Sequence, residues 1–84
     1  MTFLISASAK RTYRNELRTF EVALSSAVLR DQPVWTVAFV TEMSRPSKRL
    51  SIPGLHAIAS PSADGAFARA CDCIDKWLLV NPKA

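Results

Sequence analysis

The residues best suited to chemistry in this sequence are cations. Residues 1–50 contain eight Lys/Arg against four Asp/Glu, whereas residues 51–84 contain three of each, so the first part carries the whole net charge of +4. Segregated positive charge attracts anionic partners, such as an acidic protein surface or the phosphates of a nucleic acid. We predict that the binding site consists of two clusters, namely Lys10, Arg11, Arg14 and Arg18, and Arg45, Lys48 and Arg49.

A nucleophilic enzyme is the hypothesis raised by His56, because histidine can activate a thiol such as Cys71 or Cys73. The sequence contains no Gly-x-Ser-x-Gly motif, and its two glycines, Gly54 and Gly65, are too few for a phosphate-binding loop. A lone histidine beside a Pro-Gly turn is typical of a surface residue. We therefore expect the protein not to be an enzyme and to need no cofactor.

The two cysteines lie two residues apart within a helical pattern, so their side chains point ~200° apart and a disulfide between them is unfavourable. Together with His56 they still fall short of the four ligands of a structural zinc site. We expect free, partly buried thiols in a reducing compartment and no metal site.

The composition is that of a globular protein. The chain has 84 residues, 49% of them hydrophobic and 21% charged, which predicts one small domain over residues 1–84. Its apolar runs are far shorter than the ~20 residues of a membrane-spanning helix. The apolar start lacks a preceding basic residue, and Lys10 and Arg11 follow too early for a signal peptide. We expect a cytoplasmic protein that does not contact a membrane.

A C-terminal helix is the clearest predicted element. Ser60 can cap it, and Pro61 suits the first helical position because its missing N–H costs nothing there. The pattern predicts that the helix ends near Val80. Its apolar face consists of Phe67, Ala70, Cys71, Ile74 and Leu78.

Three further segments are predicted to contain strands. The stretch Pro33–Met43 alternates two mostly apolar sets of residues, which is typical of an interior strand covered on both faces. A short strand is expected over Met1–Ser8. In Leu50–Ala59 the Pro53-Gly54 pair predicts a turn, with a short strand over Leu55–Ala59.

The stretch Tyr13–Leu29 fits both a helix and a strand. Its content of Ala, Leu, Glu and Arg favours a helix, although Glu21 would interrupt the apolar face. A helix would also place cations at its positive N-terminal end, which is unfavourable. We favour a strand over Leu17–Ser25. The predicted fold class is then α+β, a small antiparallel β-β-β-β-α meander with the amphipathic helix packed on one face, and β-α-β-β-α is the alternative.

In a meander the first and third connections lie at the same end of the sheet, so we expect the two cationic clusters to converge in one basic rim. This predicts a non-enzymatic binding or regulatory module whose partner is a protein or a nucleic-acid backbone. A homodimer through a sheet edge is also possible. The alternative function is a small inhibitor or accessory protein, of the kind found on mobile elements, that blocks a larger complex.

From Phe20 onward the chain resembles, in outline, the small β-β-β-α domain of HicB-type antitoxins. Two hydrophobic strands lead into Ile52-Pro53-Gly54, and Ser60–Phe67 then opens a helix of similar pattern. The chain departs from that family in its less acidic helix start and its longer turn between strands. The resemblance favours the strand interpretation and implies no particular function.

Overall fold

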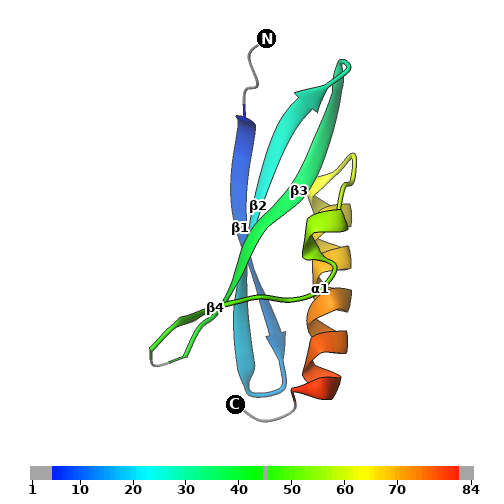
Figure 1. The fold of residues 1–84 in the computed structure, drawn as a ribbon. Helices are drawn as coiled ribbons and strands as arrows, with labels where there is room; N and C mark the ends of the chain where they lie inside the picture. The colour runs from blue at the N-terminus through cyan, green and yellow to red at the C-terminus, as the bar shows by residue number, and fades with distance from the viewer. Residues whose placement is uncertain (1–4, 45, 82–84) are drawn as a thin grey trace.

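The chain folds as a four-stranded antiparallel sheet with one long helix against it (Figure 1). The computed structural model describes residues 5–44 and 46–81. Its strands lie side by side in chain order: β1 (Ile5–Asn15), β2 (Arg18–Leu29), β3 (Gln32–Glu42) and β4 (Lys48–Leu50). Helix α1 (Ala63–Val80) follows. The α+β class and the β-β-β-β-α meander are therefore confirmed.

The strand predicted over Leu17–Ser25 is confirmed as part of β2, although Leu17 lies in the turn before it, and alternate side chains of β2 enter the core. Phe20, Val22 and Leu24 are at most 1% exposed. Burial of this alternate set outweighs the helix propensity of the individual residues. Of the strand predicted over Met1–Ser8, residues 1–4 lie outside the described residues and residues 5–8 belong to β1. This strand runs on to Asn15, so the first connection is only the two-residue turn Glu16-Leu17.

β3 carries a bulge that explains its two apolar sets. Ala23 pairs with Phe39 and Leu24 pairs with Val37, so Ala38 has no opposite residue on β2. The extra residue shifts the alternation of side chains between the two faces of the strand by one position. As a result, Val37 before the bulge and Val40 after it both contact the core under the helix. β3 is an interior strand of the sheet, as predicted. The prediction that both of its faces are covered is wrong, because Thr36 and Ala38 are exposed on the side away from the helix.

The helix starts two residues later than predicted. Ser62 caps it by accepting a hydrogen bond from the Gly65 N–H at 3.0 Å, whereas Ser60 still pairs with Trp35 through two backbone hydrogen bonds of 2.7 and 3.0 Å. Pro61 therefore precedes the cap. A Cβ atom on Gly65 would lie 2.3 Å from the Ser60 Oγ, so any larger residue here would force the Ser60 side chain to move.

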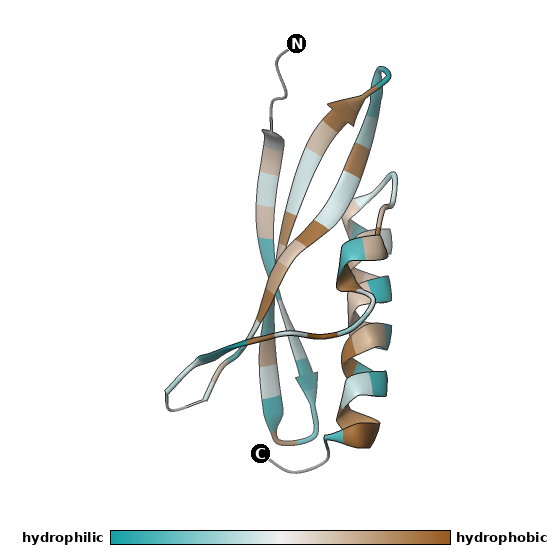
Figure 2. Cartoon of the chain, in the orientation of Figure 1, coloured by the Kyte–Doolittle hydropathy of each residue, from teal (hydrophilic) through white to brown (hydrophobic). Residues whose placement is uncertain are grey.

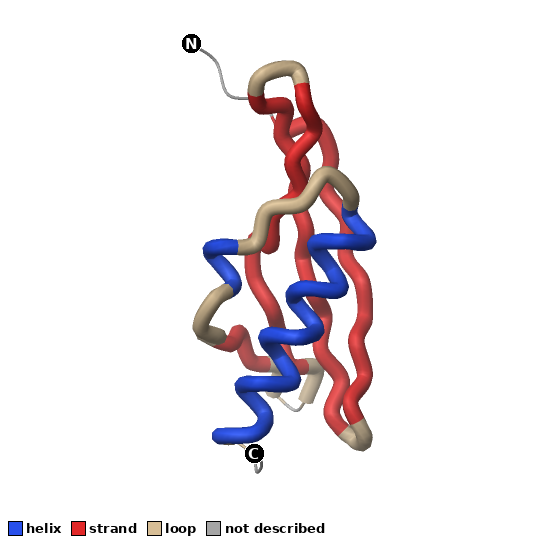
Figure 3. Tube along the Cα trace, turned by 90° about the vertical axis from the view of Figure 1, so that its right-hand side faces the viewer, coloured by secondary structure: helices blue, strands red, loops and turns tan. Residues whose placement is uncertain are grey.

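The core lies between α1 and one face of the sheet (Figure 3). Ala66, Ala70 and Ile74 are fully buried along the helix, and the two alanines let its backbone approach the strands closely. Of the predicted apolar face, Cys71 is only half-buried. The last turn of the helix is hydrophobic but exposed, with Leu79 81% and Val80 77% accessible (Figure 2).

The segment after β4 contains a 3-10 helix, η1 (Leu55–Ala57), so the strand predicted over Leu55–Ala59 is wrong. Gly54 has a φ of 90°, a left-handed conformation that suits glycine, and it turns the chain away from the sheet. Leu55 and Ile58 then cover one end of the core. Within residues 5–44 and 46–81, no helix has both the length and the apolar character needed to cross a membrane.

Candidate anion-binding surface

The first cationic cluster is divided by the alternation of β1. Arg11 and Tyr13 point toward the helix, because Arg11 pairs with Asp64 and the Tyr13 hydroxyl donates to Asp75 at 2.6 Å. Successive residues of a strand point to opposite faces, so Lys10 and Arg14 lie on the other face. We call that face, which α1 does not cover, the open face of the sheet.

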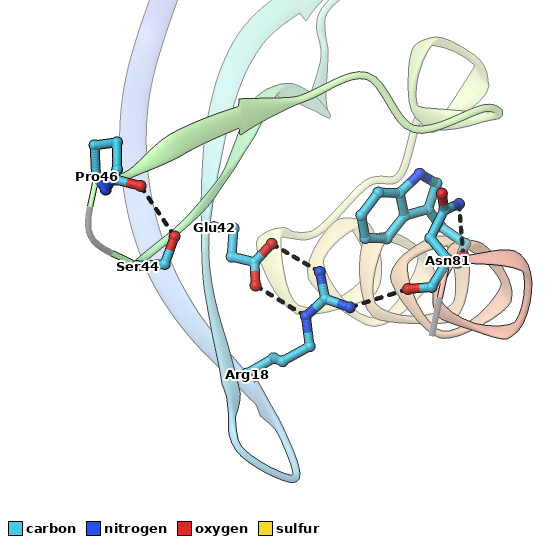
Figure 4. Close-up of polar contacts among 6 residues, drawn as sticks. Arg18, Glu42, Ser44, Pro46 and Asn81 are labelled. Atoms are coloured by element: carbon cyan, nitrogen blue, oxygen red, sulfur yellow. Dashed lines mark hydrogen bonds and ion pairs between the residues drawn. The ribbon is translucent and has the colours of Figure 1, made fainter. Parts of the chain in front are cut away.

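The helix-side cations are neutralised by carboxylates. Arg18 donates to both Glu42 oxygens at 2.8 Å and to the Asn81 carbonyl at 3.0 Å (Figure 4). Its guanidinium also lies 5.4 Å from the ring centre of Trp77. The hydrogen bonds from Arg18 hold the pKa of the Glu42 carboxyl below its usual range.

Arg11 forms its ion pair with Asp64 beside the Phe67 ring. Arg11 and Arg18 therefore hold the sheet and helix together.

The Tyr13 contact joins β1 to the helix in the same way. Asp75 also accepts a hydrogen bond from the Asn15 side chain at 2.8 Å. The hydrogen bond to Asp75 raises the pKa of the Tyr13 hydroxyl, with further contributions from burial and from the charge of Asp75. This cluster is structural, and sequence reasoning did not find it because its members are about 60 residues apart along the chain.

The second cluster lies on the opposite edge strand. Lys48 and Arg49 belong to β4, whereas Arg45 lies outside the described residues. Lys48 stands opposite Glu42 and lowers the pKa of that carboxyl further. The Arg49 guanidinium lies over the Phe39 ring, 4.0 Å from its centre.

The two clusters lie at the same end of the sheet and meet only on its helix side, where Arg18 and Lys48 both lie beside Glu42. Across the strands Thr12 pairs with Glu21, Glu21 with Thr41, and Thr41 with Arg49. Three strand spacings of ~4.8 Å put about 14 Å between the backbones of β1 and β4. On the open face the described cations stay apart, because Lys10, Arg14 and Arg49 lie within the two edge strands rather than in the connections. Lys10 and Arg14 flank the open face on one side, and Arg49 flanks it on the other.

A shallow hollow lies on the open face over β1, β2 and β3. Its volume is about 370 Å³, and it is lined mainly by small side chains, with Lys10 at one side and Phe39 at the other. Ser25 and Thr36 add hydroxyl groups, which lie 3.4 Å apart. The hollow is lined by Ser8, Ala9, Lys10, Ala23, Leu24, Ser25, Ala38 and Phe39.

Glu21 and Phe39 are the residues of this face that sequence reasoning missed. Glu21 lies between the buried residues Phe20 and Val22, so it points to the open face near the middle of the sheet. When Tyr13–Leu29 is interpreted as a helix, Glu21 only interrupts the apolar face. The alternation of side chains in a strand was the signal that could have predicted Glu21 on the face opposite Phe20 and Val22.

The histidine and the thiols are not joined by any hydrogen bond in the described part of the chain. His56 is exposed on η1 and lines a different pocket from Cys73, and no described hydrogen bond joins them. Burial, with the charges of Asp75 and Asp72, raises the pKa of the Cys71 thiol to about 11, so this group stays protonated at neutral pH. Among the described residues, both cysteines are free and no three acidic, His or Cys side chains gather as metal ligands.

Comparisons with known proteins identify no relative. No family model matches the chain, and no curated protein or solved structure matches it either. The similarity in outline to HicB-type antitoxins is thus not accompanied by a family match. The geometry of the open face is what remains to support a function.

Proposed function

We propose that this protein is a non-enzymatic binding module that holds an anionic partner on the open face of its sheet. The observation that carries the proposal is the division of the cations. Among the described residues, the ion pairs are those of Arg11 and Arg18 on the helix side. Lys10, Arg14 and Arg49 have no carboxylate partner there and flank one uncovered face. Their charge is available to a ligand.

The same charges argue against the homodimer through β1. This strand pairs only with β2 among the described residues, so its outer edge is open. A second copy paired along that edge would bring two rows of Lys10, Arg11 and Arg14 together, and like charges facing each other are unfavourable. An anionic partner is favoured by the same cations.

Charge removal from the open face tests the proposal. The triple variant Lys10→Gln/Arg14→Gln/Arg49→Gln should bind heparin, a polyanion without bases, at least about tenfold more weakly than the wild type at low salt. The control Arg30→Gln/Arg69→Gln/Lys76→Gln removes three charges elsewhere and should change the Kd less than about threefold. Fluorescence titration measures both, with thermal melts to check folding.

Equal losses in the two triple variants would mean that net charge alone governs binding, which contradicts an assigned surface. A wild-type protein that binds no polyanion at low salt would also contradict the proposal. A Kd that rises steeply with salt in the wild type, and less steeply in the first variant, supports it.

A further inference from the structure

The central charge of the open face is negative. Glu21 lies between β1 and β3, with Thr12 and Thr41 as its neighbours across the strands. The cations stand outside it, on β1 and on β4. A polyanion crossing this face is attracted by the cations at its margins but meets one repulsive carboxylate between them. A partner with anionic groups at its margins and N–H donors at its centre fits this distribution of charge.

Phe39 and Arg49 form a stacking surface beside this centre. The guanidinium lies 4.0 Å from the ring centre, and the half-buried ring borders the hollow of small residues that leads to Lys10. Aromatic rings and guanidinium planes are the groups on which unpaired bases stack in proteins. Ala23 and Ser25, which line the hollow, leave room for a flat ring above the sheet.

We propose that the anionic partner is a single-stranded nucleic acid. This inference rests on the function proposed above. The phosphates contact Lys10 and Arg14 on one edge and Arg49 on the other, while bases lie over the hollow beside Phe39. The carboxylate of Glu21 accepts hydrogen bonds from base N–H groups, as acidic side chains do with the amino group of cytosine.

A double helix and an acidic peptide fit this face less well. Bases in a duplex are paired and stacked, so the flat open face would reach only its phosphates and leave Phe39 unused. An acidic peptide brings carboxylates toward Glu21 and has no planar group for the stacking surface. The experiment below also tests an acidic peptide as the alternative partner, and a probe without bases shows whether phosphates alone account for binding.

The experiment compares three fluorescein-labelled probes with the full chain: a mixed-sequence single-stranded DNA of about ten nucleotides, an abasic phosphodiester of equal length, and poly-glutamate. The wild type should bind the DNA at least about tenfold more tightly than the abasic probe at the same salt concentration. Phe39→Leu should weaken DNA binding about tenfold and abasic binding much less, through the lost support of Arg49 alone. The control Phe67→Leu makes the same exchange on the helix side and should change DNA binding less than about twofold.

Equal affinity for the DNA and the abasic probe would overturn the inference, as would equal losses for both probes in Phe39→Leu. Tighter binding of poly-glutamate than of DNA would assign the face to an acidic protein instead. These outcomes leave the heparin result intact, so they are distinct from a failure of the proposed function.

Glu21→Gln provides an independent readout. If phosphates crossed the centre of the face, this variant would bind DNA more tightly than Asp72→Asn, which removes one negative charge from the helix. We expect no such gain, because the carboxylate faces base N–H groups. A gain of more than about threefold over the control would contradict the proposed placement of the bases.

Discussion

Replacing Glu42 with glutamine should lower the free energy of unfolding by about 3–5 kcal/mol, the usual cost of breaking a buried ion pair. The Glu42 side chain is 9% exposed and that of Arg18 is 17% exposed. The variant leaves the guanidinium poorly solvated without its carboxylate. Denaturant unfolding followed by circular dichroism measures the change.

The exposed ion pair between Arg11 and Asp64 is the matched control. The Asp64 side chain is 85% exposed, so Asp64→Asn should cost at most about 1 kcal/mol. The double variant Arg18→Met/Glu42→Leu should recover much of the loss, because apolar side chains of similar size avoid the desolvation of both charges. Similar losses for Glu42→Gln and Asp64→Asn would contradict the assignment of Arg18–Glu42 as the buried structural pair.

The same pair predicts an acid dependence. Because the pKa of Glu42 is lowered in the folded protein, its contribution to stability is complete above the unfolded value of about 4.3. The contribution is lost as the pH falls through the folded pKa. The stability gap between wild type and Glu42→Gln should therefore narrow below about pH 4. If the difference in unfolding free energy between the wild type and Glu42→Gln stays constant from neutral to acid pH, the prediction is contradicted.

Truncation of Ile74 to alanine should cost about 2–5 kcal/mol, because it opens a cavity between the helix and the sheet. Ile74 is fully buried, whereas Leu79, one turn and one residue later, is 81% exposed. Leu79→Ala should therefore change the unfolding free energy by less than about 0.5 kcal/mol. The comparison uses the same denaturant titration. A larger loss for Leu79→Ala would mean that α1 presents a different face to the sheet.

Much of the architecture could be predicted from periodicity. The alternation around Phe20, Val22 and Leu24 indicated the strand that makes the fold a meander, and the buried positions Ala70 and Ile74 followed from helical spacing. The exact helix start did not follow, since Ser60 was predicted to be the cap and Ser62 is the cap in the structure. The backbone pairing of Ser60 with Trp35 decides between them, and it joins segments distant in sequence.

The candidate surface was harder to predict because charge clusters in sequence are not clusters in space. Lys10 and Arg11 are adjacent, yet the pleat of β1 sends one to the open face and the other to Asp64. In the sequence Arg18 and Arg14 are equivalent cations of one cluster, but in the fold Arg18 pairs with Glu42 on β3. Knowing which cations are free therefore requires the register of the sheet.

Amide chemical-shift mapping locates the partner on the protein surface. A single-stranded oligonucleotide is titrated into isotope-labelled protein, and shift changes are followed residue by residue. We expect little change in α1, and the largest changes at Lys10, Thr12, Glu21, Phe39 and Arg49. Changes concentrated on the exposed side of α1, or around Leu17 and Leu79, would contradict it.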